Sequence, residues 1–248
     1  MKYLIKLSYD GYDYAGFQAQ KEKRTIQGEF LKAFNKIYPN KSIIYASRTD
    51  AKVHAYGQII QFDIDDKVSD NFLRSLNSLL PENIRATKLI AVSDQFHCQK
   101  DVVYKHYQYR ISFDNNDVFN KRYSTYSYYA LDKELFKKAL NKYLGKHDFT
   151  SFNTTPLSIK SNQVKEIFRI DFKEVDNLWI IDFYGDGFLR YMIRILIGIA
   201  MLIARNKMDL KMIDKMFEEK HKNHYKYVAP ACGLFLMEVF YDKLREDA

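Results

Sequence analysis

The segment Ser47-Arg48-Thr49-Asp50-Ala51-Lys52-Val53-His54-Ala55-Tyr56-Gly57-Gln58 combines one carboxylate with two cations, a histidine and a tyrosine. Strand-like apolar sequence lies on both sides of it, at 41–46 and at 57–64. We therefore expect a loop over 47–56 whose two ends are held by strands. Most charged loops are simply solvated, but loops positioned by rigid elements are also where binding and catalytic residues concentrate.

Strands and helices are expected to alternate on both sides of this loop. In the first half the patterns predict strands over 3–9, 41–46, 57–64 and 85–92, with helices that begin after Thr25 and Ser69 and end before Pro39 and Pro81. In the second half they predict strands over 104–113, 163–175, 178–184 and 232–241, with helices from Asp132 to Gly145, over 188–205 and over 209–220.

The order of these elements predicts an α+β protein. The first half reads strand–helix–strand–strand–helix–strand, the order of a ferredoxin-like unit. We expect two such α/β lobes that share a mainly antiparallel sheet, with a central cleft. The N-terminal lobe, 1–103, would carry the Asp50 loop, and the C-terminal lobe, 104–248, would complete the cleft.

Composition excludes several classes of protein. The chain has 248 residues, of which 47% are hydrophobic, so it can bury a core and is not disordered. Two cysteines, Cys98 and Cys232, are too few for a disulfide scaffold.

The chain is basic: Lys and Arg number 39 against 31 Asp and Glu, which gives a net charge of +8. This charge fits a nucleic acid or membrane-surface partner, and equally a general lysine bias. The 20 tyrosines can pack in a core or stack on unpaired bases.

Nothing in the pattern predicts export or membrane insertion. The first residues alternate apolar and polar side chains, unlike a signal peptide. The longest apolar run, 195–204, is far shorter than the ~20 residues that span a bilayer. We expect a cytoplasmic protein with no membrane segment.

The Asp50 loop is the best candidate for chemistry. Neighbouring cations would keep this carboxylate ionised, since its reference pKa is only ~3.9, and it could act as a nucleophile or a metal ligand. A metal site is not expected, because there is no Cys-x-x-Cys motif and the histidines are scattered, at His54, His97, His106, His147 and, among lysines, His221 and His224. Gly185-Asp186-Gly187 does not continue into a dinucleotide or phosphate-loop motif, and no nucleophile elbow is present. We expect no cofactor.

Short motifs occur along nearly the whole chain. In the first half they are Tyr9-Asp10-Gly11 with Gly16-Phe17-Gln18, Thr25-Ile26-Gln27, Arg48-Thr49-Asp50-Ala51 with Val53-His54-Ala55 and Gly57-Gln58, Leu76-Asn77 with Leu79-Leu80-Pro81, and Phe96-His97. In the second half they are Lys105-x-Tyr107-x-Tyr109, His147-Asp148-Phe149 with Ser151-Phe152, Gly187-Phe188-Leu189-Arg190-Tyr191-Met192-Ile193-Arg194 with Gly198, and Ala229-Pro230-Ala231 with Gly233-Leu234. In sequence and order they resemble the motifs of the tRNA pseudouridine synthase A family, including its RTDAGVHA-x-GQ signature.

The chain departs from the family pattern at a few positions. Lys52 stands where the family usually has glycine, and Ser47, Phe17, Tyr191 and Gln99 also replace the usual residues. If position 52 needs a positive φ, Lys52 would be strained there. The alternative, which we favour from sequence, is an ordinary backbone in which Lys52 adds a phosphate contact.

The resemblance implies the pseudouridine synthase fold and an isomerase, formally an intramolecular transferase. Members of the family isomerise uridine to pseudouridine at positions 38–40, in the anticodon stem-loop of tRNA, as part of tRNA processing and RNA modification. The reaction needs no cofactor and no metal. The expected partners are tRNA, through RNA binding, and a second copy of the chain in a homodimer.

The resemblance also assigns residues. Asp50 becomes the catalytic aspartate, Tyr107 stacks on the target uracil and can help to remove its C5 proton, and Arg194 pairs with Asp50. The expected substrate-binding residues are Arg48, Lys52, His54, Leu189 and Arg190. Without the resemblance, Tyr107 would be one more core tyrosine and Arg194 a helix arginine that reaches solvent. Whether Asp50 attacks C1′, adds to the base or removes a ribose proton stays open.

Two other functions fit parts of the sequence. A non-catalytic RNA-binding module on the same fold would explain the net charge and the lysine at position 52. A metal-dependent phosphodiesterase could use Asp50, although the scattered histidines count against it.

Overall fold

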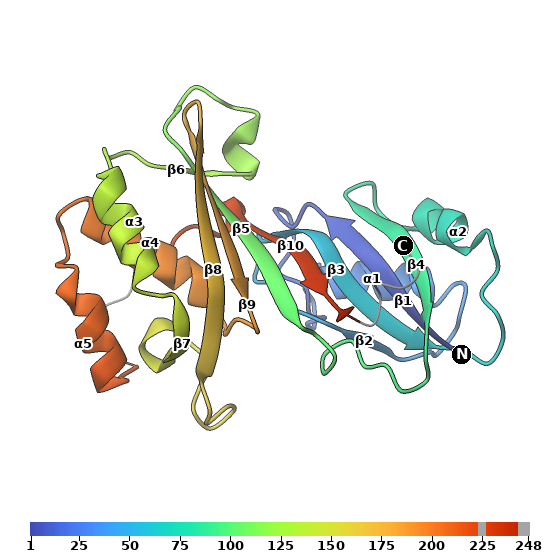
Figure 1. Ribbon diagram of the computed structural model, residues 1–248. Helices are drawn as coiled ribbons and strands as arrows, with labels where there is room; N and C mark the ends of the chain where they lie inside the picture. Colours follow the sequence, from blue (N-terminus) through green and yellow to red (C-terminus); the bar gives the residue numbers. More distant parts are fainter. Residues whose placement is uncertain (223–226, 243–248) are drawn as a thin grey trace. The chain divides into compact units, whose positions relative to one another are not determined.

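Residues 1–222 and 227–242 are described in the computed structural model (Figure 1). The chain forms two compact units, Met1–Lys105 with Phe235–Ala248, and His106–Leu234. The boundaries fall inside two strands, β5 (Tyr104–Ser112) and β10 (Leu234–Phe240), so each of these strands contributes residues to both units. The C-terminal strand, which the sequence division assigned to the second lobe, thus has most of its residues in the first unit.

The sheet of the first unit is built around β1 and β3. Its strands are β1 (Lys2–Tyr9), β2 (Ile43–Tyr45), β3 (His54–Asp63), β4 (Ile84–Val92) and β10. β1 pairs antiparallel with β3 and β4, and β2 pairs antiparallel with β3. β10 pairs parallel with β3, with Phe235 opposite His54 and Leu236 opposite Ala55. The residue that begins β3 is therefore held by a segment from the far end of the chain.

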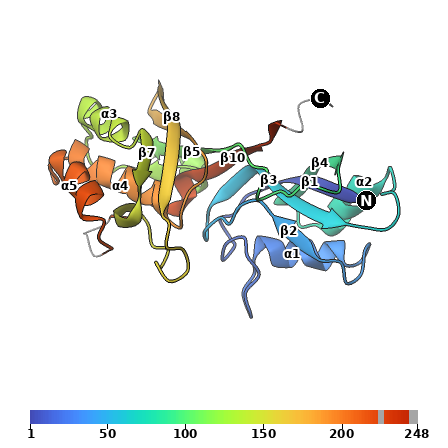
Figure 2. The same cartoon turned by 60° about the horizontal axis from the view of Figure 1, so that its bottom comes forward.

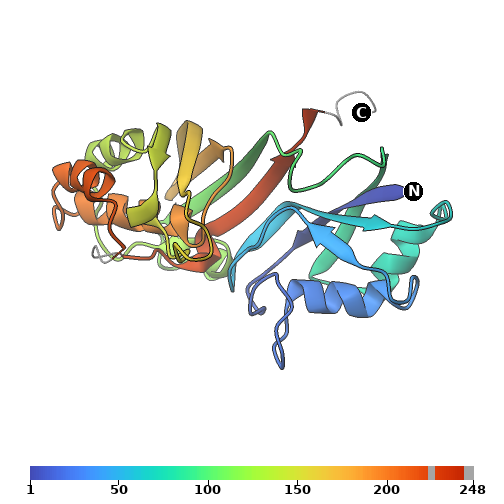
Figure 3. The same ribbon diagram turned by 90° about the horizontal axis from the view of Figure 1, so that it is seen from below.

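Helices α1 (Ile26–Phe34) and α2 (Phe72–Leu79) lie on one face of these strands (Figure 3). Thr25 caps α1 as expected, because its Oγ1 accepts a hydrogen bond from the Gly28 N–H at 3.2 Å. α2 begins later than expected, with Asn71 and not Ser69 at the N-cap. Phe34 of α1 packs against Phe62 of β3, with ring centroids 5.0 Å apart. This aromatic contact joins the helix layer to the sheet.

The second unit packs helices on one side of its main strands. Its strands are β5, β6 (Thr125–Tyr126), β7 (Gly145–Asp148), β8 (Val164–Val175) and β9 (Leu178–Gly185), and its helices are α3 (Lys133–Asn141), α4 (Met192–Ala204) and α5 (Lys211–Glu219). β8 pairs antiparallel with β7 and with β9, whereas β6 runs parallel to β5. Figures 1 and 2 show the three helices on the same side of β7 and β8.

α4 is the buried helix of this unit. Eleven of its residues are buried, which accounts for the apolar run at 195–204. At Gly198 an added Cβ would lie 1.9 Å from the Tyr227 carbonyl oxygen, so glycine lets this backbone approach closely. In the part of the chain that is described, no helix is long and apolar enough to cross a membrane.

Most element types match the sequence prediction, and their boundaries differ in informative places. The α+β class and the mostly antiparallel pairing are confirmed. The loop expected over 47–56 was too long, because β3 already begins at His54, where β10 provides a pairing partner. α4 begins at Met192 and not at 188, because Tyr191 adopts φ 60, outside the helical region. The short strands β6 and β7 were missed.

Candidate active site

The Asp50 loop is tied to the segment that follows β1. The Phe17 N–H donates to the Thr49 carbonyl at 3.0 Å, and the Lys52 N–H donates to the Tyr14 carbonyl at 3.3 Å. The hydroxyls of Tyr9 and Thr49 hydrogen-bond at 2.7 Å in a buried position. These bonds fix the backbone on both sides of Asp50, so the carboxylate is carried by a rigid loop.

Two glycines allow the two segments to approach this closely. An added Cβ at Gly11 would lie 1.9 Å from the Val53 carbonyl oxygen. Gly16 has φ +104, a conformation that favours glycine, and its Cβ would lie 3.1 Å from the Thr49 carbonyl oxygen. The YDG…GFQ motif and the Asp50 motif are therefore two halves of one packed structure.

Gln58 closes the start of the loop from inside β3. Its side chain is fully buried, its Nε2 donates to the Ser47 carbonyl at 2.7 Å, and its Oε1 accepts from the Ser47 N–H at 3.2 Å. The amide thus satisfies both backbone groups of Ser47, where the loop leaves β2. The sequence analysis gave Gln58 no role. Its place at the end of the signature motif was the available signal.

Lys52 corrects the backbone conformation that we favoured from sequence. Its φ is +66, in the left-handed region, and the Val53 N–H closes a tight turn on the Asp50 carbonyl at 3.2 Å. A lysine in this conformation costs roughly 1–2 kcal/mol relative to the ordinary regions, which accounts for the family's usual glycine. The Lys52 Nζ lies 5.1 Å from the centre of the Tyr12 ring, a cation–π distance that keeps the ammonium beside the loop.

The other first-unit candidates differ in exposure. Arg48 is exposed and Asp50 is half-buried, so both can reach a bound molecule. His54 is only 2% exposed. Its Nδ1 lies 3.0 Å from Asp10 Oδ1 and 3.2 Å from the Gly11 nitrogen, and its ring stacks on Phe235 at 4.7 Å. His54 therefore links the start of β3 to the YDG motif.

In the second unit, Tyr107 lies on β5 with its ring edge-on to Phe188, at a centroid distance of 5.2 Å. Leu189 and Arg190 follow Phe188 in the segment that leads into α4, Leu189 buried and Arg190 exposed. Phe188, which the sequence analysis left without a separate role, thus packs against Tyr107 from the same segment that carries the two substrate-binding candidates.

Arg194 is held from two sides within the second unit. Its Nε donates to the Ala229 carbonyl at 2.8 Å, and its guanidinium carbon lies 4.8 Å from the centre of the Tyr191 ring. The Arg190 guanidinium approaches the same ring, at 5.2 Å. Tyr191, where the family usually has histidine, therefore lies against both arginines.

The first unit contains Arg48, Asp50, Lys52 and His54, and the second contains Tyr107, Leu189, Arg190 and Arg194. The completed site, in which the two sets meet, stays a prediction. Among residues 1–222 and 227–242, no three His, Cys, Asp or Glu side chains gather as metal ligands. His224 lies outside the described residues.

Comparison with known proteins gives one consistent answer. A family model described as tRNA pseudouridine synthase matches residues 139–242. A protein named tRNA pseudouridine synthase A from Latilactobacillus sakei is 37% identical over 246 residues, which is 97% of this chain and 98% of that protein. Another of the same name from Phytoplasma mali is 39% identical over 242 residues, covering 96% and 98%. The chain therefore belongs to the tRNA pseudouridine synthase A family and has its α+β pseudouridine synthase fold.

Proposed function

We propose that this protein isomerises uridine to pseudouridine at positions 38–40 in the anticodon stem-loop of tRNA, with Asp50 as the catalytic aspartate. The observation that carries the proposal is the Asp50 loop, which bears the family signature and is fixed by the Gly11–Phe17 segment. A rigid carboxylate beside exposed cations suits a reaction that builds positive charge on a ribose and needs the nucleotide held still.

The reaction is balanced without an oxidant or a reductant. The bond between N1 of uracil and C1′ breaks, the base turns, and C5 bonds to C1′. The proton on C5 then leaves, and N1 gains one. An ionised Asp50 could attack C1′, add to the base or remove a ribose proton, the three roles that the sequence left open. The proposal does not depend on which of these roles it performs.

The second-unit residues would hold the flipped base. Tyr107, supported edge-on by Phe188, would stack on the uracil, and Leu189 would pack beside it. Arg194, whose Nε is fixed by the Ala229 carbonyl, would pair with Asp50 and keep it ionised. Taking a base out of the stack costs a few kcal/mol, which these contacts must supply.

The remaining candidates would grip the RNA or support the loop. Arg48, Lys52 and Arg190 are exposed cations suited to phosphates. His54 is in the same predicted substrate-binding set. Because it is buried, its role there is to hold the Asp50 loop in position. We further propose that the enzyme acts as a cytoplasmic homodimer on tRNA.

The test is pseudouridine mapping combined with tritium release from C5-tritiated tRNA. The wild type should modify an unmodified transcript at positions 38–40, and Asp50→Ala should abolish tritium release while its tRNA affinity stays within a few-fold. Tritium release by Asp50→Ala would contradict the role of Asp50. Binding without modification would indicate an RNA-binding module, and chelator-sensitive cleavage would indicate a phosphodiesterase.

A further inference from the structure

Two buried amides hold the loop between η2 (Thr150–Phe152) and β8 in a closed shape. Asn153 Nδ2 donates to Gln163 Oε1 at 2.7 Å. Gln163 Nε2 donates to the carbonyls of Thr155, at 2.9 Å, and Lys160, at 3.1 Å. The side chains of Asn153 and Gln163 are 0% and 1% exposed. Because one amide binds both sides of the loop, residues 154–162 form a built structure and not a loose connection.

The same loop is bonded to the segment that carries Leu189 and Arg190. The Thr154 N–H donates to the Arg190 carbonyl at 3.1 Å, and the Arg190 N–H donates to Thr155 Oγ1 at 3.2 Å. The position of the loop is thereby fixed relative to a segment that we assign to substrate binding.

Lys160, on this loop, interacts electrostatically with Lys165 at the start of β8 and with Asp186 in the turn that follows β9. The Lys165 Nζ lies 3.6 Å from Asp186 Oδ2. It also lies 3.1 Å from the place where a Cβ on Gly187 would be, so the absence of a side chain there leaves room for the ammonium. Asp186 Oδ1 is already used, because it accepts the Glu166 N–H at 3.0 Å.

The ammonium groups of Lys160 and Lys165 affect each other. Partial burial lowers the pKa of Lys160, and the nearby charge of Lys165 lowers it further, against the opposing effect of Asp186. Lys165 is ion-paired with Asp186, whose other oxygen accepts a backbone N–H, and the two ammonium groups repel each other. A further anion would relieve their repulsion, and a compact ammonium on a long stem is suited to a phosphate.

We propose that Lys160 and Lys165 form a binding site for one backbone phosphate of the tRNA, next to the nucleotide held by Arg190. The proposal rests on the proposed function for the identity of the RNA. Ile159, which is 77% exposed on the same loop, gives the ribose of that nucleotide an apolar surface to pack on.

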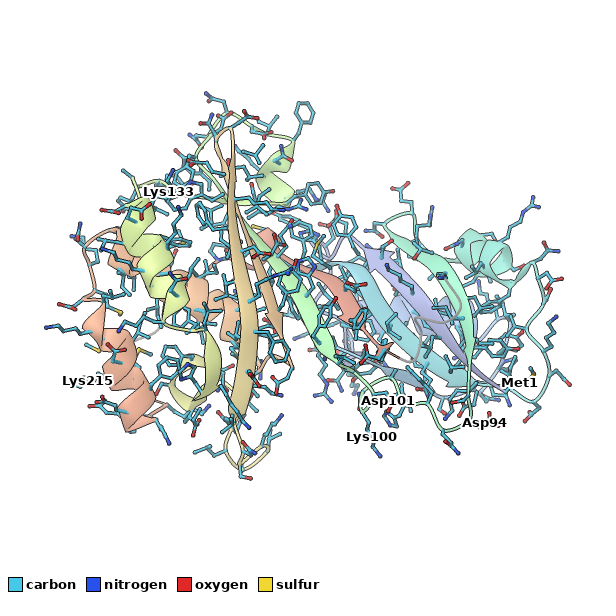
Figure 4. The ribbon with its side chains drawn as sticks, viewed as in Figure 1. Met1, Asp94, Lys100, Asp101, Lys133 and Lys215 are labelled. Carbon is cyan, nitrogen blue, oxygen red and sulfur yellow. The ribbon has the colours of Figure 1, made fainter. Side chains whose placement is uncertain are left out.

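The test is the salt dependence of tRNA binding by Lys160→Gln and Lys165→Gln. Removing one ammonium–phosphate interaction should lower the slope of log affinity against log salt by about 0.7–0.9. We expect a ~5- to 20-fold weaker Kd, which is about 1–1.8 kcal/mol at 1.4 kcal/mol per factor of ten, with kcat at saturating tRNA within twofold. Lys133→Gln on α3 and Lys215→Gln on α5, both labelled in Figure 4 and both in surface ion pairs, are the controls and should change neither quantity.

Asp186→Asn separates this site from a merely structural ion pair. If Lys165 only stabilises the turn through Asp186, then Lys165→Gln and Asp186→Asn should weaken tRNA binding alike. The phosphate site predicts opposite effects on tRNA affinity. Asp186→Asn should tighten tRNA binding and Lys165→Gln should weaken it, whereas Lys165→Arg, which keeps the charge, should bind tRNA like the wild type. Unchanged slopes in both lysine variants would overturn the site. If the wild type forms no pseudouridine but the lysine variants still lower the salt-dependence slope, the result would support the phosphate site and contradict the proposed function.

Discussion

At the scale of single residues, Lys52 shows a conflict between backbone and side chain. Its φ of +66 favours glycine, yet its ammonium lies beside Tyr12 on the loop that carries Asp50. Lys52→Gly should raise the free energy of unfolding by about 1 kcal/mol, because it removes the left-handed strain. Lys52→Ala keeps that strain and is the matched control. Urea denaturation measures both variants, and equal stabilities would show that the turn is not strained.

The same pair of variants tests the phosphate contact of Lys52. Both remove the ammonium, so both should weaken tRNA binding by a similar factor, roughly 3- to 10-fold as for one exposed phosphate contact. A loss of affinity in only one variant would trace the effect to the backbone of the turn. Filter binding of tRNA at two salt concentrations gives the comparison.

At the scale of elements, the loop depends on a side chain that never needs to meet substrate. Gln58 on β3 binds both backbone groups of Ser47, so Gln58→Ala should let the loop shift. A displacement of about 1 Å can cost ~100-fold in rate, and we expect kcat to fall 10- to 100-fold with tRNA affinity within threefold. Gln61→Ala is the control, since Gln61 is equally buried on β3 but accepts from Cys98 N–H, away from the loop. Equal losses of kcat in both variants would indicate general destabilisation.

Strands β5 and β9 are joined by a buried carboxylate. Asp182 accepts from His106 Nε2 at 2.7 Å and from Gln108 Nε2 at 2.9 Å. Burial alone would raise the pKa of Asp182, but these hydrogen bonds outweigh it and the pKa is lowered. The group therefore adds stability above the ordinary aspartate pKa of ~3.9, and this stability is lost as the pH falls through the lower folded value.

Asp182→Asn should accordingly reduce the free energy of unfolding by about 1.5–3 kcal/mol near neutral pH, the range for hydrogen bonds to a charged group. The difference from the wild type should shrink steadily below pH ~4. Denaturation across pH measures it, with the exposed Asp94→Asn as the control, which should match the wild type throughout (Figure 4). A difference independent of pH would mean that the charge of Asp182 plays no part.

At the scale of the whole molecule, the sequence predicted what depends on local pattern and missed what depends on distant segments. Alternation and caps placed β8, β9 and the start of α1, because those signals lie within one segment. The early start of β3 at His54 was missed, because it needs β10 as a partner. The site residues came from motif order alone. Local pattern could not have shown that Gly16, Gly11 and Gln58 hold the Asp50 loop, since each acts on a residue distant in sequence.

The return of the C-terminal strand to the first unit can be tested through one glycine. An added Cβ at Gly57 would lie 2.4 Å from the Met237 carbonyl oxygen, so β3 can accept β10 only because position 57 has no side chain. Gly57→Ala should therefore push the strands apart and cost about 1–3 kcal/mol, the range for overpacking. In a chain of this length, that is a fall of roughly 2–4 °C in Tm for each kcal/mol.

Asp63→Ala, at the exposed end of β3, is the control for a substitution in the same strand. It should leave Tm within 1–2 °C of the wild type, as expected of ~0.5 kcal/mol at most. Because His54 pairs with Phe235 in the same register, Gly57→Ala should also slow pseudouridine formation more than it weakens tRNA binding. An unchanged Tm would mean that β10 does not rest on β3 at this point, and the first unit would then have to hold the Asp50 loop without it.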